Sequence, residues 1–374
     1  MPKAAPLSEN ALARIVDEAA AICAVPAPTF AESERAALVQ DLLVSAGLTA
    51  QIDAAGNVVA RVGGDEPALA VVAHLDTVFP DLTTISIVRD GVRLTGPGIG
   101  DNALGIAAML YVARALAQTP PSRPVLFAAT VGEEGLGDLS GVTALLDSEQ
   151  IRALIAVEGH GIDCLAVGGI ASIRLRAEFS GPGGHSWSDR GRGSAIHALI
   201  GAGERALAAA APAAFNIGVI EGGTTVNAIA QSATMVIDIR HGDPRVVSAA
   251  HARVERTLAT GLPDGVSVQV TVVGNRPGGA NRPNDPLLEA ARAARTAVGL
   301  GPADEIFAST DANAAYARDI PAVGIGITRG DFAHREDEWI AVPPIALGVA
   351  SLLELVRRLD ERRHQSTTRA PSRL

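Results

Sequence analysis

Four short runs made almost entirely of apolar residues recur along this chain of 374 residues. Such runs are typical of strands buried on both faces of a parallel sheet. Segments with helical spacing precede, separate and follow them. Strands that alternate with helices predict an α/β fold with a mixed, largely parallel sheet sandwiched by helices. The runs lie at 68–73, 124–131, 154–157 and 322–327, and the helical segments include two within 12–48 and one each at 106–116, 287–298 and 344–359.

The pattern changes near residue 171, where apolar and polar residues begin to alternate with a period of two. That period is typical of a strand in a sheet with one solvated face. Two helical and three further strand patterns follow, in the order βαββαβ of a ferredoxin-like domain. We therefore predict a discontinuous α/β domain, 1–171 with 281–374, interrupted by an α+β domain at 172–280. A tail without apolar period, from Glu361, is expected to be disordered.

Composition excludes several classes of protein. With 41 acidic against 31 basic residues and a net charge of −10, nucleic acid is not an expected partner. Cys23 and Cys164 form no disulfide framework, which favours a reducing compartment. The N-terminal segment lacks the apolar run of a signal peptide, and the apolar stretch at 195–220 is interrupted by charges and by Pro212. We expect a cytoplasmic protein without a membrane span.

Histidines and carboxylates follow the apolar runs. These residues are His74 with Asp76, Glu133 with Glu134, Glu158 and, further from its run, His334; Asp101 ends a glycine-rich segment, GPGIGD. Taken singly, each has a simpler explanation, such as a capped histidine, a helix N-cap or a solvated acidic pair. Together they would meet at the sheet edge where open α/β folds bind ligands. Mixed histidine and carboxylate ligands favour Zn²⁺, Mn²⁺ or Co²⁺.

An ordered set of motifs covers most of the chain, from about Val71 to Trp339. With these motifs the chain resembles the M20 metallopeptidases, the co-catalytic zinc hydrolases of the aminoacylase and carboxypeptidase type. The resemblance implies a zinc-exopeptidase-like catalytic domain with an inserted lid through which two chains form a homodimer. The motifs are HLDTVFP, GPGIGDN, VGEEGLGD, VEG, GPGGHSWS, GGTTVNAIA, DIR, STDAN and HREDEW.

The resemblance also implies a role for each candidate residue. Two divalent metal ions, zinc foremost and manganese or cobalt as alternatives, would be held by His74, Asp101, Glu134, Glu158 and His334. Asp101 would bridge the ions, and the peptide bond after it would be cis. Asp76 would orient His74, and Glu133 would be the general base that activates a metal-bridging hydroxide. In the lid, His185 would stabilise the oxyanion in the neighbouring subunit's site, and Asn227 and Arg240 would hold the substrate.

Charge balance agrees with this assignment. Two divalent ions carry +4, whereas Asp101, Glu134 and Glu158 supply −3 and a bridging hydroxide supplies −1. Glu133 then remains outside the metal shell and is able to take a proton.

The expected reaction is hydrolysis of the amide bond of a small substrate, such as a dipeptide or an N-acyl amino acid. Glu158 is the residue that carboxypeptidases and deacylases of the family favour at its position. Some carboxypeptidase relatives carry an arginine five residues before the Thr-Asp pair, where this chain has Glu305, so a carboxylate clamp is not expected there. The alternatives are hydrolysis of a non-peptide C–N bond, a metal-free binding protein, and a serine hydrolase that uses Ser186.

Overall fold

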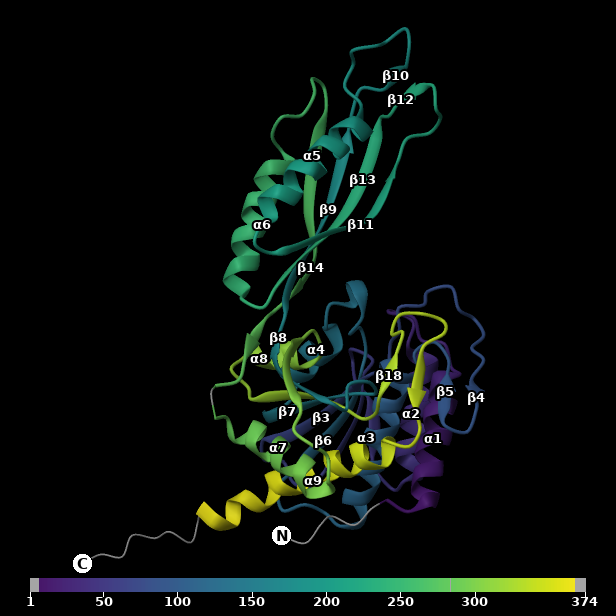
Figure 1. The fold of residues 1–374 in the computed structure, drawn as a ribbon, viewed down its shortest axis with the longest axis vertical. Coiled ribbons are helices and arrows are strands. Elements are labelled where there is room, and N and C mark those ends of the chain that lie inside the picture. Colours follow the sequence, from purple (N-terminus) through teal and green to yellow (C-terminus); the bar gives the residue numbers. More distant parts are fainter. Residues whose placement is uncertain (1–6, 283, 367–374) are drawn as a thin grey trace, which may run out of the picture. The chain divides into compact units, whose positions relative to one another are not determined.

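The computed structural model describes residues 7–282 and 284–366, and the chain divides into two compact units. The first unit comprises 1–169 and 280–374, and the second comprises 170–279 (Figure 1). We call them the large unit and the inserted unit.

The large unit is built on a nine-stranded sheet with the order β1-β2-β6-β3-β7-β17-β8-β15, in which β16 pairs with β8. Its central strands β6, β3, β7 and β17 are parallel. β1 pairs antiparallel with β2, β2 with β6, and β8 with β17, whereas β16 pairs in parallel with β8. The mixed, largely parallel sheet is thus confirmed. Its strands are β1 (Ala50–Ile52), β2 (Val58–Val62), β3 (Ala68–His74), β6 (Val125–Thr130), β7 (Ile151–Glu158), β8 (Cys164–Gly169), β15 (Gly279–Ala280), β16 (Asp304–Ala308) and β17 (Ala322–Gly326).

Helices cover both faces of this sheet, because successive side chains of a buried strand point to opposite sides. In β3, Leu69 and Val71 join one apolar cluster, and Ala70 and Val72 join the other. The first cluster is covered by α1 (Glu9–Cys23), α2 (Ser33–Ser45), α3 (Leu104–Gln118), α7 (Pro286–Val298) and α9 (Ile345–Ser366), and the second by α4 (Ser140–Ser148) and α8 (Ala312–Tyr316). The predicted helix-sheet-helix layering is confirmed.

Local signals explain where several helices begin and end. The Ser8 hydroxyl accepts a hydrogen bond from the amide of Ala11 at the start of α1. Asp285 caps α7 in the same way, with Pro286 at the first helical position. Gly299 ends α7 in a left-handed conformation, with a φ of 89°.

A smaller four-stranded sheet, in the order β18-β19-β5-β4, belongs to the same unit. No strand pattern in the sequence predicted it, because its strands are only two or three residues long. They are β4 (Val88–Arg89), β5 (Arg93–Thr95), β18 (Gly330–Asp331) and β19 (Trp339–Ala341).

The inserted unit forms a four-stranded antiparallel sheet with the order β11-β13-β9-β14. Numbered along the unit, this is strand order 2-3-1-4, which is the ferredoxin-like arrangement, and the α+β prediction for this region is confirmed. Its elements are β9 (Ala171–Ser180), β10 (Gly184–His185), α5 (Ala195–Ala210), β11 (Ala214–Gly222), β12 (Ala228–Ile229), β13 (Ser232–His241), α6 (Pro244–Leu258) and β14 (Ser267–Arg276). Both helices pack on one face of the sheet over a core of their own.

One expectation needs correction. Helix α9 continues to Ser366, six residues into the tail from Glu361 that we expected to be disordered. Arginine, glutamate and glutamine favour helix even without an apolar period; residues 367–374 lie outside the described range. Among the described residues, one helical stretch, Ile99–Gln118, is long and apolar enough to cross a membrane, and most of it is buried within the protein. Such burial is typical of a core helix.

The buried guanidinium of Arg35 connects α2 to the segments that follow α1 and β3. Arg35 of α2 is fully buried and donates to the carbonyl oxygens of Val25 (2.6 and 2.9 Å) and Leu75 (2.7 Å). Burial lowers the pKa of its guanidinium to about 10, which leaves the group charged at neutral pH.

We expect Arg35→Met to lower the free energy of unfolding by about 3–5 kcal/mol, since each buried carbonyl left unpaired costs about 1–3 kcal/mol. Urea unfolding followed by circular dichroism measures this change. Arg14→Met is the control, because the Arg14 side chain is more than half exposed and its partner Glu18 keeps its ion pair with Arg114, so the loss should be less than about 1 kcal/mol. Equal unfolding midpoints for the two variants would contradict the assignment.

Candidate metal centre

The central parallel strands bring three of the candidate sites to one edge of the large sheet. His74 is the last residue of β3 and pairs in register with Thr130, the last residue of β6. Glu133 and Glu134 follow β6 directly, and Glu158 ends β7, the neighbour of β3 on the other side. This is the edge where open α/β sheets bind ligands.

Asp101 reaches the same edge from the loop between β5 and α3. Gly98 turns the loop with a φ of 80°, and the peptide bond between Asp101 and Asn102 is cis, as the family resemblance implies. The Asn102 side chain donates to the Val157 carbonyl (2.7 Å) and accepts from the Gly159 amide (3.1 Å). A Cβ atom on Gly159 would lie 2.2 Å from the carbonyl oxygen of Gly100, so only glycine allows this approach. The loop is therefore fixed against the end of β7.

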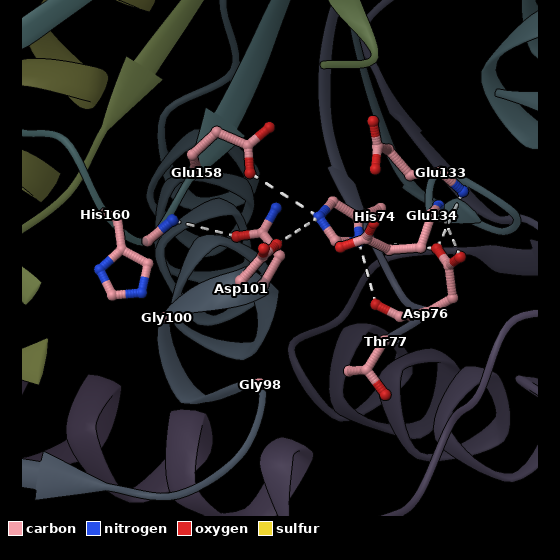
Figure 2. A network of polar contacts seen from close by, with 12 residues as sticks. His74, Asp76, Thr77, Gly98, Gly100, Asp101, Glu133, Glu134, Glu158 and His160 are labelled. Atoms are coloured by element: carbon pink, nitrogen blue, oxygen red, sulfur yellow. Dashed lines mark hydrogen bonds and ion pairs between the residues drawn. The ribbon is translucent and has the colours of Figure 1, made fainter. Parts of the chain in front are cut away.

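The five predicted metal ligands lie together. The Nε2 atom of His74 lies 3.0 Å from Asp101 Oδ1 and 3.8 Å from Glu158 Oε2. The Nε2 atom of His334 lies 3.2 Å from Asp101 Oδ2 and 3.0 Å from Glu134 Oε1. Asp101 thus presents one oxygen to each histidine. Figure 2 shows the first half of this arrangement, with dashed lines from His74 to Asp101 and Glu158.

Asp76 has two functions in the structure. Its main-chain oxygen lies 3.0 Å from His74 Nδ1, which must donate, so Nε2 is the ring nitrogen left to face Asp101. Its carboxylate lies 3.5 Å from the same ring nitrogen and accepts from the amides of Glu133 (2.9 Å) and Glu134 (2.8 Å), as Figure 2 shows. Asp76 therefore connects the His74 strand to the turn that carries both glutamates, a function that its position in the sequence did not indicate.

The histidines carry unusually basic rings. Hydrogen bonds to Asp101 and Glu134 raise the pKa of His334 to about 10. Burial opposes a charge on His74, yet its bonds to Asp101 and Asp76 outweigh burial and raise its pKa well above the usual range. Both imidazoles therefore lie where the surrounding carboxylates favour a positive charge.

The carboxylates show the complementary effect. Burial, together with the nearby charges of Asp101 and Glu133, raises the pKa of Glu158 well above its usual range. Burial also opposes charge on Asp101, but hydrogen bonds from His334 and His74 hold its pKa below the usual range. The cluster contains more negative charge than its surroundings balance, which a bound cation would correct.

The donor set fits two metal ions. His74, Asp101 and Glu158 form one group, and Asp101, Glu134 and His334 form another, with all ligand atoms of a group within 4.8 Å of one another. In a tetrahedral site with bonds of about 2.0–2.1 Å, two ligands are roughly 3.3 Å apart. The distances of 3.0 to 3.8 Å around the two histidines match that value. In a third group, His74 with Glu133 and Glu134, the ligand atoms also lie within 4.8 Å of one another, so proximity alone does not show which glutamate would bind metal.

The lid candidates lie within the inserted unit. His185 in β10 pairs with Ala228 in β12, beside Asn227, whose main-chain oxygen accepts from the Ser186 amide (3.0 Å). His185 Nδ1 accepts from the amide of Trp187 (3.2 Å), which leaves the ring proton on Nε2 as a donor. The structure thus brings His185 and Asn227 together.

Arg240 lies at the other end of the same unit. It stands near the end of β13, opposite Ser172 and Ala214, and its guanidinium binds the Asp238 carboxylate. The strand rises about 3.4 Å per residue, so the eight steps from Ser232 to Arg240 span about 27 Å. His185 lies beyond the Ser232 end, since Gly181 binds Gln231 and His185 pairs with Ala228.

Two residues of the centre were not predicted. Glu338 is fully buried and accepts from the amides of Gly98, Gly100 and Asp101 at 2.7–2.8 Å. His160 Nε2 lies 2.7 Å from the same carboxylate. Glu338 lies in the motif HREDEW, and His160 directly follows the motif VEG. Their role was not predicted, because the partners of Glu338 are mostly peptide amides, which a sequence pattern does not reveal.

Comparison with known proteins identifies the class. The family model of peptidase family M20/M25/M40 matches residues 70–358, and the chain belongs to this family. It is therefore an M20 metallohydrolase that acts on C–N bonds.

Curated relatives agree with this family. A succinyl-diaminopimelate desuccinylase of Corynebacterium glutamicum is 26% identical over 349 residues, which cover 88% of this chain and 92% of that protein. A putative [LysW]-lysine/[LysW]-ornithine hydrolase of Pyrococcus abyssi is 31% identical, but the match spans only 40% of this chain and 41% of the relative.

Solved structures share the fold. A tripeptidase of Staphylococcus aureus matches with a TM-score of 0.78 and 20% identity over 93% of this chain and 98% of its own. A dinuclear metal-binding M20 peptidase of Bacillus subtilis matches with a TM-score of 0.67 and 17% identity, over 95% of this chain and 99% of its own. The zinc-exopeptidase-like fold expected from the sequence is confirmed.

Proposed function

We propose that this chain hydrolyses the amide bond of a small substrate, a dipeptide or an N-acyl amino acid, with two divalent metal ions. Zinc is the foremost candidate, and manganese or cobalt are the alternatives. One observation carries the proposal: Asp101 directs its two carboxylate oxygens to two separate histidines, each of which also faces a glutamate. This is the geometry expected of a carboxylate that bridges two ions.

The chain's own residues supply the proton chemistry. Bound ions would polarise the scissile carbonyl and acidify water. Glu133, which the charge balance leaves outside the metal shell, would accept a proton from that water and return it to the leaving nitrogen. The turn that positions Glu133 is held by Asp76, so base and ligand keep a fixed spacing. His185 would donate from Nε2 to the oxyanion.

The substrate class is supported by Glu305 and by the relatives. Glu305, in the position where some carboxypeptidases have an arginine, forms an ion pair with Arg292 (2.5 Å). A carboxylate clamp at this point is therefore not part of the proposal. The desuccinylase relative removes an acyl group, according to its name, and the structural relatives include peptidases, so small N-acyl and peptide amides are the first candidates.

A non-peptide C–N bond is the second candidate. An amidase of the hydantoinase/carbamoylase family from Burkholderia vietnamiensis shares the fold, with a TM-score of 0.70. The substrate screen below includes this class.

The lid residues support a homodimer. His185 and Arg240 are separated by more than about 27 Å along the inserted unit, whereas a dipeptide spans roughly 7 Å. If both residues contact one substrate, they belong to different chains. Each site of the proposed dimer would then receive His185 and Asn227 from the partner chain.

An edge of the inserted unit offers a surface for this dimer. β11 is the outer strand of its sheet and exposes Val219 and Ile220, and α5 exposes Ile200 and Leu207. An unpaired strand edge with apolar neighbours is a ready site for strand pairing between two chains.

A cytoplasmic location remains part of the proposal. Cys23 and Cys164 are both free thiols, as a reducing compartment would require.

The decisive experiment is a substrate screen of the metal-loaded protein. Dipeptides, N-acyl amino acids and carbamoyl compounds are assayed in parallel with Zn²⁺, Mn²⁺ or Co²⁺. Turnover of dipeptides or N-acyl amino acids supports the first candidate. Turnover confined to carbamoyl compounds would replace it with the second.

A further inference from the structure

Glu338 holds together the loops that carry the proposed ligands. One of its carboxylate oxygens, Oε2, accepts from the Gly98 amide at 2.7 Å. The other, Oε1, accepts from the amides of Gly100 and Asp101, both at 2.8 Å, and lies 2.7 Å from the Nε2 atom of His160. All these donors belong to the loop before α3 or to the segment after β7.

The main chain around Glu338 adds to this connection. Its carbonyl oxygen accepts from the Gly96 amide at 2.8 Å, and its amide donates to the Arg335 carbonyl at 3.2 Å. Glu338 stands four residues after His334, within the turn between β18 and β19. The same residue therefore contacts the Asp101 loop and helps to shape the His334 turn.

His160 fills the space between these loops. A Cβ atom on Gly100 would lie 2.2 Å from its Nε2 atom, and a Cβ atom on Gly330 would lie 2.3 Å from its Nδ1 atom. The imidazole is thus held between two glycines, two residues after Glu158. Its Nδ1 atom is buried without a hydrogen-bond partner, so the bond to Glu338 is the polar contact that fixes the ring.

We propose that Glu338, with His160 as its partner, is the positioning residue that sets the spacing between Asp101 and the ligands Glu158 and His334. This inference rests on the two-metal function proposed above. Glu338 acts through the peptide amides of the Asp101 loop and touches neither substrate nor metal. The proposal explains why a carboxylate is fully buried at this point: only an acceptor with two oxygens can bind three amides and an imidazole together.

The isosteric change Glu338→Gln separates this role from simple packing. In the wild type both oxygens of the Glu338 carboxylate accept hydrogen bonds. In either orientation of the glutamine side chain, its NH₂ group would therefore face at least one peptide N–H donor. The loop must then shift, and the Asp101 oxygens move relative to the two histidines. Glu149→Gln is the matched control, since Glu149 pairs with Arg61 and has no contact with the centre among the described bonds.

The measurements are the dissociation constant of Co²⁺, its visible absorption spectrum in the protein, and the melting temperature before metal is added. We expect Glu338→Gln to weaken Co²⁺ binding about 10–100-fold and to change the spectrum, with kcat lowered more than KM is raised. Glu149→Gln should bind Co²⁺ as the wild type does. Unchanged Co²⁺ affinity and spectrum in Glu338→Gln would overturn the proposal, even if the melting temperature falls.

His160 gives a second test if Glu338→Gln does not fold. Glutamine can place its amide nitrogen near the position of Nε2, so His160→Gln should keep the bond to Glu338 and most of the Co²⁺ affinity. His160→Leu loses the donor and should bind Co²⁺ more weakly. Equal affinities for these two variants would contradict the role of His160. If the wild-type protein itself binds no Co²⁺, the proposed function fails and not this inference alone.

Discussion

Glu133→Gln should keep its bound metal near the wild-type amount and lower kcat by about 10²–10⁴-fold. Glutamine fills the same space but cannot accept the proton of the attacking water or return it to the leaving nitrogen. The amide of residue 133 would still donate to Asp76, so the turn should keep its shape. Steady-state kinetics and elemental analysis of the same preparation test this prediction.

Glu134→Ala is the informative comparison. The Glu134 carboxylate lies 3.0 Å from His334 Nε2 and belongs to the second ligand group. The Glu134 amide donates to the Asp76 carboxylate at 2.8 Å. Its removal should lower the metal content as well as the rate. A metal-depleted Glu133→Gln beside a fully loaded Glu134→Ala would mean that the two neighbouring residues have exchanged roles.

His185→Ala should lower kcat by roughly 10²–10³-fold, the typical cost of a lost oxyanion donor. The ring is exposed on β10, and its Nδ1 atom is engaged by the Trp187 amide, so Nε2 is the donor that remains. Metal content should not change, because His185 is not among the residues of the ligand groups.

Mixing two inactive variants tests whether His185 acts in the partner's site. In a mixed dimer, the His185→Ala chain keeps its own Glu133 and receives an intact His185 from its Glu133→Ala partner. With random exchange, about half the dimers are mixed, and each has one competent site of two. About a quarter of wild-type activity should return if the sites are independent. No recovery after verified exchange of subunits would show that His185 acts within its own chain or has no catalytic role.

The buried strands of the fold could be predicted because each leaves a compact apolar signal. β3, β6, β7 and β17 are buried on both faces, and apolar runs as short as theirs are typical of buried strands. β16 was not predicted, because it lies at the border of the sheet and is mostly exposed, with acidic residues in its sequence. β8 was missed for a related reason: it ends in two glycines, which strand patterns do not favour.

The candidate site, too, could be predicted only in part from the sequence. His74 and Glu158 could be placed at one edge because they end neighbouring parallel strands. Asp101 could be assigned only through the family resemblance, since its loop is held by Asn102 and Glu338 through bonds to peptide groups. Contacts of this kind depend on the folded backbone and leave no periodicity in the sequence.

The most direct test of the two-metal account is the metal content and the turnover of one sample, measured together through chelation and reloading. The account predicts that removal of metal abolishes turnover, and that Zn²⁺, Mn²⁺ or Co²⁺ restores it as the bound metal rises toward two ions per chain. The reason for this expectation is the close arrangement of the five proposed ligands, His74, Asp101, Glu134, Glu158 and His334. Full turnover by protein shown to contain no metal would contradict it.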